Sequence, residues 1–219
     1  MSWLFDEEHR ALQDRFGTRP LADRLEKGDL RTRLGEAERT FIEARDMFFL
    51  STIDAEGRPT VSYKGGDTGL VRVLDEATLL FPSYDGNGMY LSMGNIAGRA
   101  EVGMLFIDFE KPRRLRVQGR AELTDDADAL STWPGAELAV RVAISGLWVN
   151  CPRYVHRHRR VETSRYVPDH DGRAPLAGWK RIDDMQDVLA PEEAAEARRQ
   201  GLIDENAWSA SVEAGDPDA

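Results

Sequence analysis

The chain has 219 residues, of which 41% are hydrophobic, and its formal net charge is −10 at pH 7. This size fits one generous domain with extensions, and the acidic balance argues against non-specific binding to nucleic acid or to an anionic membrane surface. The acidic N-terminus lacks an apolar signal core, no apolar run approaches the ~20 residues that span a bilayer, and the single cysteine cannot form an internal disulfide, so we expect a cytoplasmic protein that does not act at a membrane.

Residues 1–40 are expected to form a helical extension. Their apolar side chains follow a loose helical stripe that is broken near Gly17 and Pro20. A further helix is expected over residues 35–44, with Phe41 and Ile42 as its apolar anchors. The stripe consists of Leu4, Ala11, Leu12, Phe16, Leu21 and Leu25.

Residues 41–160 predict a mainly β domain with flanking helices. Apolar segments alternate with turns such as Asp54–Gly57, and helices are expected over Met89–Arg99 and near Asp125–Leu130. Some six strands joined by short turns favour a small closed barrel. The strand-like segments are Met47–Ile53, Thr60–Lys64, Leu70–Leu74, Thr78–Phe81, Val102–Phe109, Arg113–Leu123 and Leu138–Val149.

Residues 161–219 are expected to form a C-terminal extension. The segment Pro191–Gln200 predicts a helix, because proline stands at its start and glutamates fill its first turn. The last ten residues or so are small, polar and acidic, and we expect them to be frayed.

The run SYDGNGMYLSMGNI, from Ser83 to Ile96, joins a strand-like segment to a helix-like one. Gly86, Asn87 and Gly88 can take backbone angles that most residues avoid, so such a turn can aim several N–H groups at one point. The following helix adds its positive end, which together would suit a phosphate. The alternative is an ordinary strand-to-helix turn without a ligand.

Basic side chains on three strands are candidates for contact with an anion. Arg114, Arg116 and Arg120 share one face of the strand Arg113–Leu123, which suits either a phosphate or carboxylate ligand or a solvated face with salt bridges. Lys64 ends a strand directly before two glycines, and Arg72 lies in mid-strand, facing either solvent or a ligand.

Cys151 and the basic run from His156 to Arg160 follow the last long strand. Cys151 could be a nucleophile only with a base and a lowered pKa, and the alternative is a small buried thiol. His156 and His158 lack a clear third and fourth metal ligand, so no metal site is predicted. No Walker loop, Gly-x-Gly-x-x-Gly fingerprint or Gly-x-Ser-x-Gly elbow is present in the sequence.

Four segments, taken in order, resemble the pyridoxamine 5′-phosphate oxidase-like family of flavin-binding split barrels. The resemblance covers roughly residues 40–160 and implies a six-stranded split barrel and a symmetric homodimer with FMN at the subunit interface. The segments are FFLSTIDAEGRPTVSYKGG (48–66), GLVRVLDEATLLFPSYDGNGMYLSMGNI (69–96), VGMLFIDFEKPRRLRVQGRAEL (102–123) and NCPRYVHR (150–157).

The resemblance also implies cofactor contacts, but it names no catalytic side chain. Met89 and Tyr90 stand near the place of an Arg-Lys pair that the oxidase proper uses for the phosphate, so the positive charge must come from elsewhere. The oxidase's C-terminal substrate motif has no counterpart in residues 161–219, which argues against pyridoxamine 5′-phosphate as substrate. The implied FMN contacts are Ser62, Tyr63, Lys64, Arg72, Ser83, Asp85, Asn87, Gly88, Met89, Arg114, Arg116 and Arg153.

The expected function is an FMN-dependent oxidoreductase that acts on an unidentified small molecule by hydride transfer at the flavin. A non-enzymatic flavin binder or redox sensor and a deazaflavin-dependent reductase are the alternatives. Haem is disfavoured, because none of the four histidines falls inside the expected barrel strands.

Overall fold

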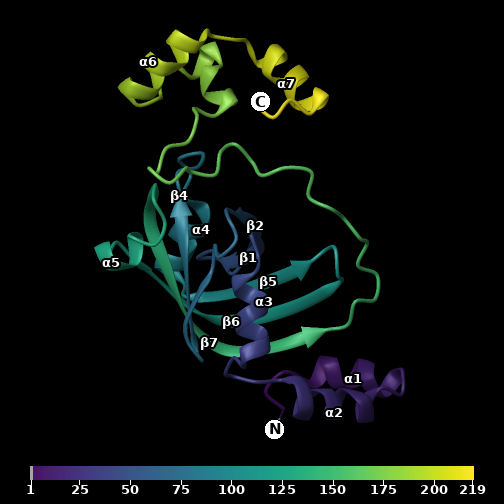
Figure 1. Ribbon diagram of the computed structural model, residues 1–219. Helices are drawn as coiled ribbons and strands as arrows, with labels where there is room; N and C mark the ends of the chain where they lie inside the picture. Colours follow the sequence, from purple (N-terminus) through teal and green to yellow (C-terminus); the bar gives the residue numbers. More distant parts are fainter. Residues whose placement is uncertain (1) are drawn as a thin grey trace. The chain divides into compact units, whose positions relative to one another are not determined.

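The computed structural model describes residues 2–219, which divide into two compact units. The first unit consists of residues 2–131 and 137–159, and the second of residues 132–136 and 160–219. The first unit contains one sheet with three helices before it and one helix between its fourth and fifth strands (Figure 1). Within residues 2–219 no helix is both long and apolar enough to cross a membrane.

The sheet has seven strands in the order β2-β1-β5-β6-β7-β4-β3. The pairings of β1 with β2, β1 with β5, β5 with β6, β6 with β7 and β3 with β4 are antiparallel. The strands are β1 (Met47–Ile53), β2 (Pro59–Gly65), β3 (Arg72–Asp75), β4 (Thr78–Tyr84), β5 (Glu101–Asp108), β6 (Arg113–Thr124) and β7 (Ala136–Asn150).

The predictions of six strands and of a closed barrel are both wrong. The seventh strand is β3, which has only four residues and a register shift between Val73 and Asp75. The described sheet has two free edges, β2 and β3, so it is open. Alternating apolar residues predict a strand, but they carry no information on whether the two outermost strands pair.

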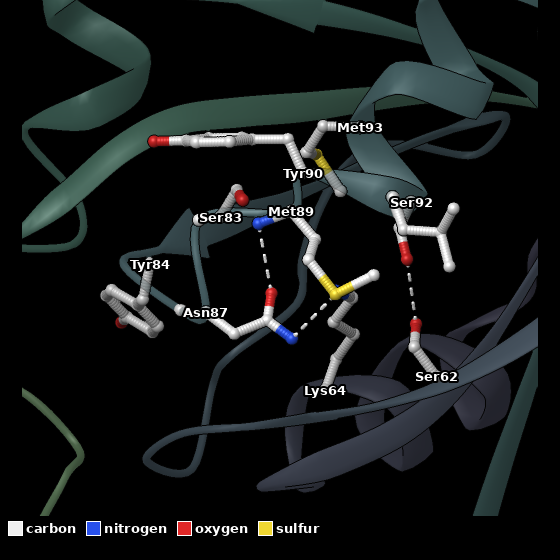
Figure 2. Close-up of a pocket in the computed structure, with 12 residues that line it drawn as sticks. Ser62, Lys64, Ser83, Tyr84, Asn87, Met89, Tyr90, Ser92 and Met93 are labelled. Carbon is white, nitrogen blue, oxygen red and sulfur yellow. Dashed lines mark hydrogen bonds between the residues drawn. The ribbon is translucent and has the colours of Figure 1, made fainter. Parts of the chain in front are cut away.

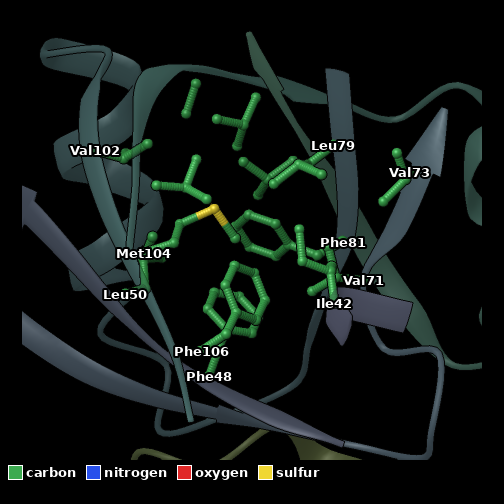
Figure 3. Close-up of a cluster of buried hydrophobic side chains, with 14 of the residues drawn as sticks. Ile42, Phe48, Leu50, Val71, Val73, Leu79, Phe81, Val102, Met104 and Phe106 are labelled. Carbon is green, nitrogen blue, oxygen red and sulfur yellow. The ribbon is translucent and has the colours of Figure 1, made fainter. Parts of the chain in front are cut away.

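Alternating burial divides the strands into an inner and an outer face. In β1, Phe48, Leu50 and Thr52 are buried, whereas the residues between them are partly exposed. The inner side chains form a core in which the Phe48 ring lies 5.0 Å from that of Phe81 and 5.4 Å from that of Phe106 (Figure 3). Burying such large rings is the main stabilising contribution that this face makes.

Two helices complete the core. Helix α3 (Glu36–Glu43) buries Phe41 and Ile42, as predicted, and α4 (Leu91–Gly98) buries Met93 and Ile96. The spacing of three residues in α4 places both apolar side chains on one helix face. A short helix, α5 (Ala127–Leu130), precedes β7.

The N-terminal segment forms two helices, α1 (Glu7–Arg15) and α2 (Arg19–Asp29). The predicted break is confirmed, because Gly17 lies between them with φ 66° and Pro20 lies in the first turn of α2. Asp6 caps α1 by accepting a hydrogen bond from the N–H of His9 at 3.0 Å.

The second unit contains two 3₁₀ turns, η1 (Gly178–Arg181) and η2 (Asp183–Met185), and two helices, α6 (Pro191–Gln200) and α7 (Glu205–Ala214). Helix α6 coincides with its prediction. The expectation of a frayed tail is wrong for residues 210–214, which belong to α7. Asp204 caps this helix at its start and Gly215, with φ 70°, ends it, so local capping outweighs the polar composition.

Candidate functional site

A hollow of about 260 Å³ lies where the ends of β2 and β4 meet the start of α4 (Figure 2). We call it the β2–α4 hollow. Its wall contains one ionisable amine, two tyrosines, three serines and two glycines, so hydrogen-bonding groups predominate over apolar ones. The lining residues are Ser62, Lys64, Ser83, Tyr84, Gly86, Asn87, Gly88, Met89, Tyr90, Leu91, Ser92 and Met93.

The turn between β4 and α4 takes two left-handed backbone conformations, at Gly88 (φ 72°) and Tyr90 (φ 48°). Glycine adopts this region without strain, whereas tyrosine rarely does. The Asn87 side chain supports the turn, since its Oδ1 accepts a hydrogen bond from the N–H of Met89 at 3.1 Å. A Cβ atom at Gly86 or Gly88 would meet nothing within 4 Å, so both glycines border open space.

The N-terminus of α4 offers free hydrogen-bond donors to this hollow. Tyr90 occupies the N-cap position and makes no side-chain cap, and the first helical bond runs from the N–H of Gly94 to the carbonyl of Tyr90 at 2.7 Å. The N–H groups of Leu91, Ser92 and Met93 have no hydrogen-bond partner among residues 2–219. Such unsatisfied donors at a positive helix end suit an anion.

Lys64 supplies the positive charge in the wall. It pairs with the buried Phe48 in the β1–β2 register, so it lies on the inner face of the sheet and is half-buried. Burial lowers the pKa of its amine. Within the described part of the chain its amine has neither an ion-pair nor a hydrogen-bond partner.

Polar side chains fix α4 against the first two strands. The hydroxyl oxygens of Ser62 and Ser92 lie 3.1 Å apart, as Figure 2 shows. Asn95 donates to Oγ1 of the fully buried Thr52 at 3.0 Å, and Thr52 Oγ1 lies 3.0 Å from Thr60 Oγ1. These contacts hold the start of the helix in place beside Lys64.

A second polar contact closes the rim of the β2–α4 hollow. The hydroxyl of Tyr90 donates to Oε2 of Glu137, at the start of β7, over 2.6 Å. That hydrogen bond raises the pKa of the Tyr90 phenol, and burial raises the pKa of Tyr84. Both tyrosines are therefore neutral hydrogen-bonding groups at pH 7.

The predicted contact residues fall into three places. Asp85 belongs to the same turn as Asn87 without lining the β2–α4 hollow, and Arg72 and Arg153 are exposed on β3 and after β7. Tyr63, Arg114 and Arg116 lie on the outer face of the sheet, away from the other predicted residues. The six that line the hollow are Ser62, Lys64, Ser83, Asn87, Gly88 and Met89.

The register fixes this separation. Ser62 and Lys64 pair with the buried Leu50 and Phe48, whereas Tyr63 pairs with Phe49 on the other side of β1. Directly paired residues point to the same side of a sheet. Arg116 pairs with Leu105 and with Trp148, which continue the face that begins at Tyr63 and Phe49.

The outer face has a hollow of its own, of about 320 Å³, which we call the outer hollow. Arg116 has no ion-pair partner among residues 2–219, and Nη2 of Arg114 donates to the carbonyl of Cys151 at 2.6 Å. The outer hollow is lined by Phe49, Ser51, Val61, Gly103, Met104, Leu105, Arg116, Val117, Gln118 and Trp148.

Sequence reasoning missed four residues that line the β2–α4 hollow beyond its turn: Tyr84, Tyr90, Ser92 and Met93. Ser92 carried a usable signal, because it stands three residues before Asn95 and thus shares a helix face with it. Cys151 is exposed and lines neither hollow, and neither does any histidine.

Comparison with known proteins gives one family match. A model described as "Pyridoxamine 5'-phosphate oxidase" matches residues 34–161, more than half of the chain. No curated protein matches the chain.

Several solved structures are similar at low identity. A "putative pyridoxamine 5'-phosphate oxidase" from Lactobacillus delbrueckii is 24% identical with a TM-score of 0.44, over 54% of this chain and 95% of that one. HupZ from group A Streptococcus is 16% identical with a TM-score of 0.45, over 57% and 100%. The heme storage protein HutZ from Vibrio cholerae is 20% identical with a TM-score of 0.39, over 53% and 94%.

Proposed function

Because the chain belongs to the pyridoxamine 5′-phosphate oxidase family, we propose that it is an FMN-dependent oxidoreductase that works as a homodimer on a small molecule. The observation that carries the proposal is the convergence of three anion-binding features on the β2–α4 hollow. These are the half-buried amine of Lys64, the free N–H groups at the start of α4, and the turn through Gly86 and Gly88.

The donor set fits the phosphate group of FMN. A phosphate would meet the Lys64 amine and the N–H groups of Leu91, Ser92 and Met93, which are left without partners in the described chain. The open space beside Gly86 and Gly88 lets a ligand approach the backbone closely. When bound, FMN would supply the hydride chemistry that no side chain can supply.

The homodimer follows from the positions of the predicted contact residues. Lys64 lies on the inner face of the sheet, and Arg114 and Arg116 lie on the outer face, so one chain cannot bring them to the same ligand. A second copy could present its outer face to the β2–α4 hollow of the first. In a two-fold dimer both sites would then be completed in the same way.

The residues of this chain would have positioning and electrostatic roles. Lys64 would neutralise part of the phosphate charge, and the Ser62–Ser92 pair would hold the helix terminus at the anion. Tyr90, held by Glu137, would border the rim. The substrate would be a small molecule other than pyridoxamine 5′-phosphate.

The test is an absorbance spectrum of the full-length protein after desalting, repeated after addition of FMN and a second desalting step. We expect retained flavin bands near one flavin per chain, and oxidation of NADH or NADPH with a quinone or nitroaromatic acceptor. Absence of retained FMN would overturn the cofactor assignment, and retention of a deazaflavin instead would point to the deazaflavin reductase. Bound FMN without turnover over a broad panel would favour a redox sensor.

A further inference from the structure

The helical arm, residues 2–30, has its apolar side chains on the outside. Neither α1 nor α2 contains a buried residue. Four large apolar side chains of the arm are about half exposed or more: Leu12 (55%), Phe16 (67%), Leu21 (58%) and Leu25 (49%). A contiguous apolar surface of this kind is rare on a monomer and marks a contact surface.

The two helices are held together by polar contacts instead. Arg10 Nη1 contacts Asp23 at 2.6 Å, and its other terminal nitrogen lies 3.6 Å from Glu26. Glu26 accepts hydrogen bonds from the Ser2 hydroxyl and from the N–H groups of Trp3 and Leu4, and these hydrogen bonds lower its pKa. The polar side of the hairpin is therefore satisfied internally, and its apolar side has no cover among residues 2–219.

The arm begins at the rim of the outer face of the sheet. Arg31 and Leu147 form a backbone bridge, with hydrogen bonds of 3.0 and 2.7 Å. The Trp3 ring lies directly over Gly146, so closely that a Cβ atom at residue 146 would overlap it. Gly146 pairs with Gln118, which lines the outer hollow.

The outer face is a second surface without a cover. Val61 and Tyr63 are 69% and 62% exposed on β2, and the outer hollow between them and Trp148 is largely apolar. Arg116 projects from this face without a carboxylate partner, whereas Glu7 and Asp29 of the arm have no ion-pair partner among the residues described. The two surfaces are thus complementary in charge as well as in apolar character.

We propose that the helical arm docks on a second copy of this chain, with Leu12, Phe16, Leu21 and Leu25 packed against the partner's outer face. The base of the arm lies at the edge of that same face, so a two-fold axis through the sheet faces carries each arm onto the other copy. This inference rests on the proposed homodimer and adds the arm as the element that encloses the flavin site.

The first experiment compares dimer dissociation constants by sedimentation equilibrium of full-length proteins. The variant L12S/F16S/L21S/L25S removes the apolar surface, and V161S/V188S is the control, since both valines are exposed (97% and 73%) in the second unit. We expect the arm variant to dissociate at least tenfold more readily and the control to match the wild type. Wild-type dimerisation by the arm variant would overturn the proposal.

The second experiment does not depend on how the quadruple variant folds. In a C151S background, a tagged F16C chain is mixed with an untagged V61C chain and treated with a short bifunctional maleimide. We expect a covalent product of the summed mass. Its absence from a mixture that is dimeric and holds flavin would overturn arm docking alone, whereas a monomeric, flavin-free wild type would overturn the proposed function itself.

Discussion

Lys64 combines two properties that oppose one another at the level of a single residue. Its half-buried amine lies beside the apolar Phe48 ring position in the register, which disfavours the charged form, and no carboxylate among the described residues compensates. The same lack of a partner leaves the amine available to an anion in the β2–α4 hollow. We therefore expect changes at Lys64 to affect ligand binding and stability in opposite directions.

For ligand binding, we expect Lys64→Met to weaken FMN affinity by ~1–3 kcal/mol, the usual range for a charge-assisted hydrogen bond. This corresponds to about a 5-fold to 150-fold higher dissociation constant in a fluorescence titration. Lys111→Met is the matched control, because Lys111 is exposed at the β5–β6 turn. Equal FMN affinity in all three proteins would contradict the placement of the phosphate.

For stability, the folded pKa of Lys64 lies below its ordinary value of 10.5, so the folded chain releases this proton at lower pH than the unfolded chain. The free energy of unfolding then rises with pH through the folded pKa toward 10.5. We expect Lys64→Met, without ligand, to melt at a higher temperature than the wild type at pH 7, with the gap narrowing toward pH 10. A melting temperature that is lower at pH 7 would refute this account.

Helix α4 depends on polar contacts with the strands beneath it. Thr52→Val keeps the shape of the side chain but removes the acceptor for Asn95, leaving a buried donor without a partner. We expect a loss of ~1–3 kcal/mol in urea unfolding. The exposed loop residue Thr68, changed to valine, should leave the midpoint unaltered, and a Thr52→Val protein as stable as that control would argue against the polar anchoring of α4.

The register shift between Gln118 and Gly119 joins β6 to β7 and makes a second test at the level of elements. A Cβ atom at Gly119 would lie 2.6 Å from the Ala143 carbonyl oxygen and from Val142 Cγ1. We expect Gly119→Ala to cost ~1–3 kcal/mol through overpacking. Gly28→Ala in α2, where nothing lies within 4 Å, should instead stabilise the chain by ~0.5–1 kcal/mol in the same denaturant series.

The sequence predicts most of these elements, because local signals decide them. The break at Gly17 and Pro20, the helix Pro191–Gln200 and all seven strand-like segments are found in the structure. Residues 210–214 were misjudged, since composition weighed more in the prediction than the Asp204 cap. The open sheet was also missed, because edge pairing depends on residues far apart in the chain.

For the candidate site, the sequence indicates the turn and Lys64 but not the faces on which the other residues lie. Tyr63 and Lys64 are neighbours in sequence and point to opposite sides of β2. Alternation predicts that they separate, but only the pairing with Phe48 and Phe49 shows which of them turns inward. The division of the predicted contacts between two faces therefore becomes visible only in three dimensions.

On the scale of the whole molecule, assembly and cofactor binding should both contribute to stability. If two chains share each flavin, the melting temperature should rise with protein concentration and rise further with FMN. A hundredfold excess of FMN over its dissociation constant would stabilise the folded state by about 2.7 kcal/mol. A melting temperature independent of both concentrations, measured by calorimetry over a hundredfold range of protein, would contradict the dimeric flavoprotein.

The exposed Cys151, the chain's only cysteine, bears directly on how such experiments are done. It follows β7 at the end of the sheet, and its carbonyl holds Arg114. In air, two such thiols on different molecules can form a disulfide that survives gel filtration and imitates a native dimer. Oligomeric state should therefore be measured with a reductant or with C151S, and the same thiol provides one defined attachment point for a fluorophore.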